Sequence, residues 1–168
     1  MAIGLTLLII LTELIHSAWL VRLPIFGQVI DPSLPLIIAV GFARPSWAPL
    51  AGLGAGLLQD LLFGGSLGLF ALSKFLVGQG AGALGRVLVE QRTLPWLVTA
   101  GATVAHQVIL AVVLIVTGLL PVAAADFGRP LLAQVLANLI AVLPVFAAAR
   151  ALFRTRRALR GREGLHGI

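Results

Sequence analysis

Apolar runs long enough to cross a lipid bilayer follow one another along almost the whole chain of 168 residues. A spanning helix needs about 20 mostly apolar residues. Hydrophobic residues make up 60% of the sequence and charged residues only 11%, and the mean hydropathy is +1.08. A soluble domain of this length would need a polar surface that this composition cannot supply. The sequence therefore predicts an all-α, polytopic membrane protein.

Six spans fit the chain, and the second of them is short. Asp31-Pro32 indicates a helix start, because Asp is a favoured N-cap and Pro a favoured first helical residue. From there to Ala43 the run is too short to cross alone, so we expect an interfacial or re-entrant segment before it. The other spans are predicted at roughly 3–21, 47–63, 66–88, 95–120 and 130–153.

Basic residues after the last span predict the orientation. The tail, residues 154–168, contains five arginines against a single glutamate: Arg154, Arg156, Arg157, Arg160 and Arg162. By the positive-inside rule this tail is cytoplasmic, and six spans then place the N-terminus in the cytoplasm too. Residues 1–153 form one six-span transmembrane domain in this interpretation. Topology and anionic lipid account for the net charge of +6, so nucleic-acid binding is not expected.

Glycines repeat at four-residue spacing on the third and fourth predicted spans. Gly52 and Gly56 form one such pair, and Gly78 and Gly82 form another. Small residues at this spacing let helix backbones approach closely in lipid. We assign a helix-packing role to these four glycines and to three at the turn between the two spans: Gly64, Gly65 and Gly68.

Six polar side chains are predicted to lie at matching depths inside the spans: Glu13, His16, Asp60, Lys74, Gln134 and Asn138. Helical spacing places His16 on the same face as Glu13, and Asn138 on the same face as Gln134. An unpaired ammonium in lipid is too costly to persist. We therefore expect Lys74 to contact either Asp60, across a tight hairpin, or Glu13, which is level with it on another helix.

This polar cluster is compatible with several uses. It can be an internal salt-bridge network that holds the bundle in register, a small-molecule pocket open to the outside, or a polar face for a partner helix. A proton relay through Glu13, His16 and Asp60 is also chemically conceivable. His106, in the fifth span, is expected to be a hydrogen-bonded bundle histidine rather than a metal ligand.

Catalytic motifs are absent from the sequence. It contains no cysteine, no Walker loop, no H-E-x-x-H and no nucleophile elbow. We therefore expect no enzymatic activity, no metal and no cofactor.

The run from Gly56 to Gly68, GLLQDLLFGGSLG, resembles the G-L-x-x-D-x-x-x-G-x-P-L-G motif of the MreD family, with Ser66 where that motif usually has proline. The short second span, the Arg44-Pro45 turn and the basic end are similar as well. The resemblance implies a non-enzymatic scaffold of the bacterial cell-elongation (rod) complex in the inner membrane. Its partner would be an MreC-type membrane protein. Through this partner it would help couple MreB filaments to peptidoglycan synthesis by a RodA-type polymerase and a class B penicillin-binding protein, and so to cell shape.

The MreD family is in turn similar, in its six-helix layout, to the substrate-binding subunits of energy-coupling-factor vitamin transporters. A second hypothesis therefore comes from a different functional class: a substrate-binding membrane subunit of a vitamin or small-solute transporter. A neighbouring gene for MreC or MreB would favour the scaffold, whereas an adjacent pair of ATPase genes would favour the transporter.

Overall fold

The computed structural model describes the backbone of residues 2–25, 27–64, 67–87, 94–118 and 128–163, and the side chains of those up to 153. In this part of the chain there are six α-helices: α1 (Ala2–Ala18), α2 (Ser33–Ala43), α3 (Ala48–Phe63), α4 (Leu69–Val87), α5 (Leu94–Val116) and α6 (Gly128–Glu163). Two short 3₁₀ turns, η1 (Leu20–Arg22) and η2 (Pro45–Trp47), follow α1 and α2. The predicted all-α class is confirmed.

Three of these helices are long and apolar enough to cross a membrane: residues 2–22 of α1 with η1, residues 94–116 of α5, and residues 128–153 of α6. The helix α2 is a shorter apolar helix. Its 11 residues span only about 16 Å at 1.5 Å per residue, as the sequence predicted for the second span.

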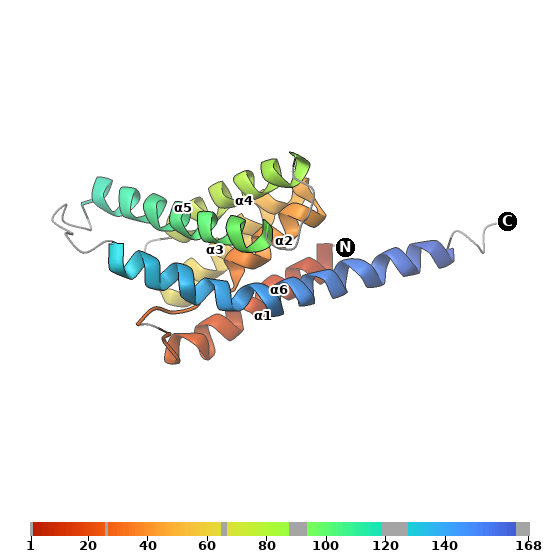
Figure 1. Ribbon diagram of the computed structural model, residues 1–168, viewed down its shortest axis with the longest axis horizontal. Coiled ribbons are helices and arrows are strands. Elements are labelled where there is room, and N and C mark those ends of the chain that lie inside the picture. The colour runs from red at the N-terminus through yellow and green to blue at the C-terminus, as the bar shows by residue number, and fades with distance from the viewer. Residues whose placement is uncertain (1, 26, 65–66, 88–93, 119–127, 164–168) are drawn as a thin grey trace.

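The short helix α2 lies at the centre of the bundle. Every residue from Ser33 to Gly41 is buried. Contacts to α2 come from α1, α3, α4, α5 and α6, which surround it (Figure 1). A helix that is apolar on all sides belongs in a core, because it has no polar face to turn toward solvent. The sequence predicted this helix, but not its central position.

Glycines let α3 and α4 pack backbone against backbone. A Cβ added at Gly52 would collide with the carbonyl oxygen of Lys74, and one at Gly78 would collide with that of Ala48. Real Cβ atoms essentially never come within 3.0 Å of such atoms. The same close approach to a neighbouring backbone occurs at Gly41, Gly56, Gly82 and Gly85. The glycine faces of α3 and α4 are thus occupied inside the bundle.

The glycines of the turn between α3 and α4 have a different role from the one predicted. Gly64 has φ 64° and ends α3 in the left-handed conformation, and Gly68 has φ 99°. A Cβ on either would meet nothing within 4 Å, so neither is a packing residue. Both are needed because other residues rarely adopt a positive φ. Gly65 lies outside the described residues.

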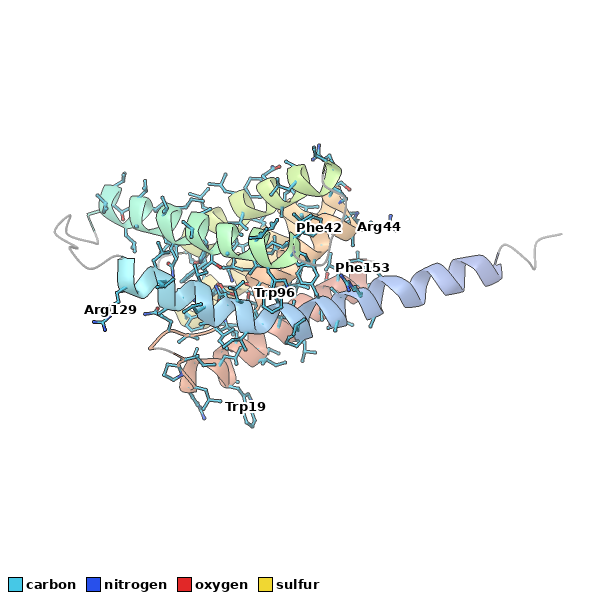
Figure 2. All side chains as sticks on the ribbon, viewed as in Figure 1. Trp19, Phe42, Arg44, Trp96, Arg129 and Phe153 are labelled. Carbon is cyan, nitrogen blue, oxygen red and sulfur yellow. The ribbon has the colours of Figure 1, made fainter. Side chains whose placement is uncertain are left out.

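The last helix continues beyond the end predicted near Phe153. The backbone of α6 is helical to Glu163, with Pro144 inside it, and the helix extends past the rest of the bundle (Figure 1). The side chains of the five tail arginines lie outside the described part of the structure. Of the arginines labelled in Figure 2, Arg44 lies toward the end from which α6 projects, whereas Arg129 lies at the opposite end.

Candidate functional site

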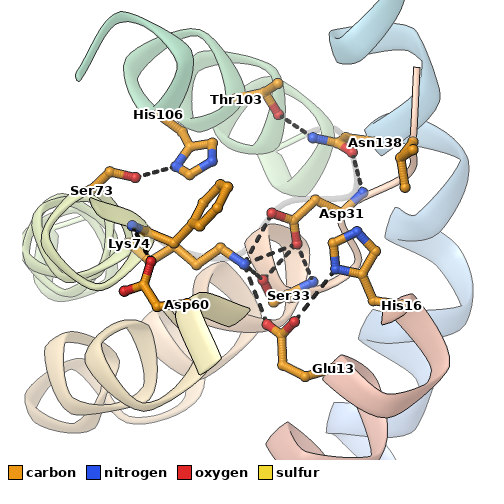
Figure 3. Close-up of polar contacts among 12 residues, drawn as sticks. Glu13, His16, Asp31, Ser33, Asp60, Ser73, Lys74, Thr103, His106 and Asn138 are labelled. Atoms are coloured by element: carbon orange, nitrogen blue, oxygen red, sulfur yellow. Dashed lines mark hydrogen bonds and ion pairs between the residues drawn. The ribbon is translucent and has the colours of Figure 1, made fainter. Parts of the chain in front are cut away.

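Lys74, on α4, is the centre of a buried polar network, and its side chain is 0% exposed. The ammonium contacts Glu13 Oε1 at 3.3 Å, Asp31 Oδ2 at 3.0 Å and the hydroxyl of Ser33 (Figure 3). A lysine ammonium has three hydrogens to donate. Each of them therefore has an acceptor here. The expected contact with Glu13 is present.

Glu13 and His16 bring α1 into this network. The second oxygen of Glu13, Oε2, lies 3.4 Å from His16 Nδ1, at the i, i+3 spacing expected from the sequence. The ring of His16 packs on Phe63 of α3, with ring centroids 5.3 Å apart. Glu13 thus uses one oxygen for α4 and the other for its own helix, and it ties α1 to the centre of the bundle.

Asp31 is the second counter-ion of Lys74, and sequence reasoning did not find this role. Its Oδ1 accepts hydrogen bonds from the Ser33 backbone N–H at 3.1 Å and from the Ser33 hydroxyl at 2.6 Å. The carboxylate therefore meets the start of α2, where the sequence predicted a cap, and binds the ammonium as well. One signal was available: α2 has no polar face, so an acid at its start has to lie in the interior.

Two amides of α6 bind the segment that precedes α2, called segment 23–32, whose described residues 23–25 and 27–32 are not helical. Gln134 donates to the Val29 carbonyl at 2.8 Å, and Asn138 accepts from the Asp31 backbone N–H at 2.8 Å. Gln134 also donates to Asn138 at 3.2 Å, in agreement with their predicted common face. In a membrane, non-helical backbone persists only where protein groups or a water-filled cavity satisfy it. These amides supply such groups to segment 23–32.

Asp60 does not pair with Lys74, so of the two predicted alternatives the structure shows the one with Glu13. Its carboxylate accepts hydrogen bonds from the backbone N–H groups of Gly68, Phe70 and Ala71, at 2.9, 3.0 and 3.1 Å. The first N–H groups of a helix lack partners within it and carry partial positive charge. At the start of α4 they attract the buried carboxylate, which closes the hairpin between α3 and α4. Of the six polar side chains predicted at matching depths, Asp60 therefore binds the start of a helix instead of joining the contacts around Lys74.

A smaller buried pair joins α4 to α5. The hydroxyl of Ser73 contacts Nδ1 of His106, and the His106 ring stacks on Phe70 with centroids 6.1 Å apart. His106 is thus a hydrogen-bonded histidine of the bundle interior. Within the described ranges, no group of three or more His, Cys, Asp or Glu residues is arranged to hold a metal ion.

A cavity formed by described residues lies away from the network. It has a volume of about 220 Å³ and is lined by Gln28, Gln107, Pro130 and Leu131, near the start of α6. Pockets for small organic ligands usually measure about 300–1,000 Å³. None of the residues around Lys74 lines it, so the charged groups are not presented to this space.

Comparison with protein-family models, with curated proteins and with solved structures finds no match for this chain.

Proposed function

We propose that this chain is a non-enzymatic membrane scaffold of the bacterial cell-elongation (rod) complex and binds an MreC-type partner. The observation that carries the proposal is that every hydrogen of the Lys74 ammonium has an acceptor inside the bundle. The ammonium donates all three hydrogens to side chains of the bundle itself. Glu13 and Lys74 are both 0% exposed, which leaves them no access to a substrate. The charged residues thus stabilise the bundle itself, which is in keeping with a scaffold.

The membrane arrangement in this proposal has six spans with both termini in the cytoplasm, similar in layout to the substrate-binding subunits of energy-coupling-factor transporters. Gly85 of α4 packs on Gly41 of α2, so these two helices end at the same level. Arg44 lies toward the end from which α6 projects (Figure 2), and Arg86 directly follows Gly85, so it lies toward the same end. A concentration of arginine at this end supports its assignment to the cytoplasm.

The partner's helix would meet an apolar surface of large side chains. Because the glycine faces of α3 and α4 are used between these helices, they are not free for another chain. Leucine, isoleucine and valine side chains cover the outer faces, and on α1 alone Ile3, Leu7, Leu11 and Leu14 are each about half exposed or more. Association would then depend on shape-matched van der Waals packing in lipid.

The experiment that tests this proposal is co-expression of the tagged chain with the MreC-type protein of the same organism, followed by detergent extraction and size-exclusion chromatography. We expect the two to co-elute in a defined ratio. An unrelated single-span protein from the same membrane, expressed at the same level, serves as the control and should elute separately.

The transport hypothesis is the outcome that would replace ours. The cavity between Gln28 and Gln107 is the observation that favours it, since two amides could orient a small solute there. Failure of the MreC-type protein to co-elute, together with a vitamin-sized molecule retained through purification and detected by mass spectrometry, would move the assignment to a solute-binding subunit.

A further inference from the structure

The buried network contains two carboxylates for one ammonium. Glu13, Asp31 and Lys74 are 0%, 5% and 0% exposed, so none of the three charges is compensated by solvent. With both acids ionised, and with neutral histidines, the group carries a net charge of −1. An uncompensated charge in the interior of an apolar bundle is costly, and buried charges persist where they are paired.

Among the described residues, the groups that surround the network do not cancel this charge. Asp60 of α3 is matched to the N–H groups at the start of α4. On α5, the titratable residue is His106, which is bonded to Ser73. From α6 come the amides Gln134 and Asn138, which carry no charge. The group that remains is His16, in contact with Glu13.

Asp31 accepts more hydrogen bonds than Glu13 does. Its Oδ1 accepts from the backbone N–H and the hydroxyl of Ser33, and both of its oxygens contact the ammonium of Lys74. A proton placed on Oδ1 would displace a donor that is already bound. Glu13 differs, because its Oε2 faces the Nδ1 atom of His16 at 3.4 Å and can share a proton with it.

We propose that Glu13 and His16 together bind one proton in the folded protein, which makes the buried network a single-proton site with no net charge. Like Glu13, which is 0% exposed, His16 is enclosed by the protein, at 3% exposure. It lies two residues before the end of α1. Loss of the proton would leave Glu13 and Asp31 competing for one ammonium, and would weaken the tie between α1 and segment 23–32.

Thermal unfolding in detergent between about pH 7 and pH 8.5 tests the proposal, because a histidine of the unfolded chain is mostly deprotonated in this range. The folded protein keeps a proton that the unfolded chain releases, so the melting temperature should fall as the pH rises. Glu13→Gln removes the surplus negative charge and leaves a balanced pair of Lys74 and Asp31. In this variant, the part of the slope of melting temperature against pH that corresponds to one proton should be absent.

His106→Gln is the matched control, since it removes another buried histidine but leaves the charges of the network unchanged. Its melting temperature should depend on pH with the same slope as in the wild type, even if the melting temperature itself is lower. An identical slope in wild type and Glu13→Gln would overturn the proposal, as would loss of the slope in His106→Gln alone.

A direct measurement on the wild-type protein decides the question even if the variants fail to fold. Solid-state NMR with ¹⁵N-labelled histidine should show His16 protonated on both ring nitrogens, or infrared spectroscopy should show the carbonyl band of a protonated carboxylic acid at neutral pH. A neutral His16 with no protonated acid at neutral pH would refute the single-proton site.

Discussion

Replacing Lys74 by methionine removes the charge at the centre of the bundle and preserves most of the volume of the side chain. The two carboxylates that it serves, Glu13 and Asp31, lie 3.3 and 3.0 Å from the ammonium and are almost fully buried. In the variant they have no cation, and each has to take up a proton or remain as an uncompensated charge. We therefore expect Lys74→Met to be strongly destabilising.

The size of the expected loss of stability follows from the groups that the ammonium binds. Removing one partner of a buried ion pair typically costs about 3–5 kcal/mol. Lys74 has two carboxylate partners and also donates to Ser33, so we expect the upper part of this range, about 4–5 kcal/mol. Neutralising both acids as well, in the triple variant Lys74→Met with Glu13→Gln and Asp31→Asn, should recover more than half of the loss.

The assay is unfolding by sodium dodecyl sulfate in mixed micelles, followed by circular dichroism. Gln79→Met is the matched control, because Gln79 is an exposed polar residue on the same helix. It should change the stability by no more than about 0.5 kcal/mol. A Lys74→Met protein within about 1 kcal/mol of the wild type, well below the usual cost of breaking a buried pair, would refute the reasoning. So would a triple variant less stable than the single one.

Three further predictions concern packing, capping and orientation. Gly52→Ala should destabilise the bundle by about 1–3 kcal/mol in the same unfolding assay, because its Cβ meets the backbone of α4. Gly80→Ala, whose Cβ meets nothing within 4 Å, should be neutral or stabilising. Equal losses of stability in the two variants would contradict the packing argument. Asp60→Ala should lower the stability by at least about 1–2 kcal/mol, since three backbone N–H groups lose their acceptor, and Asp60→Asn should lower it less. A stability of Asp60→Ala equal to that of the wild type would exclude a capping role. A green fluorescent protein fused after Ile168 should fluoresce and an alkaline phosphatase fused there should be inactive, and the reverse would refute a cytoplasmic C-terminus.

Pairs of side chains within one helix are predictable from the sequence. The pairs Glu13–His16 and Gln134–Asn138 depend only on the helical repeat, and the structure brings each pair together. The pairing of Lys74 with Glu13 is predictable as one of two alternatives, since a buried ammonium has few possible partners in an apolar chain.

Interactions that involve non-helical backbone are not predictable in the same way. Depth in the membrane can be calculated from sequence only for straight helices, and segment 23–32 has no helical rise from which the depth of Asp31 could follow. The same calculation places Asp60 near Lys74 but ignores the unpaired N–H groups at the start of α4, which compete for its carboxylate. The central position of α2 depends on packing against all the other helices, and no local pattern contains that information.

The dependence of segment 23–32 on α6 has a consequence for the order in which the protein is assembled. Val29 and Asp31 obtain their hydrogen bonds from Gln134 and Asn138, 105 and 107 residues later in the chain. During synthesis α6 leaves the ribosome after α1 to α5, so the backbone of the early segment lacks these partners until α6 has been inserted. A chain truncated before α6 should then expose this segment to quality-control proteases in the membrane. Biogenesis of the bundle is therefore completed from its C-terminal end.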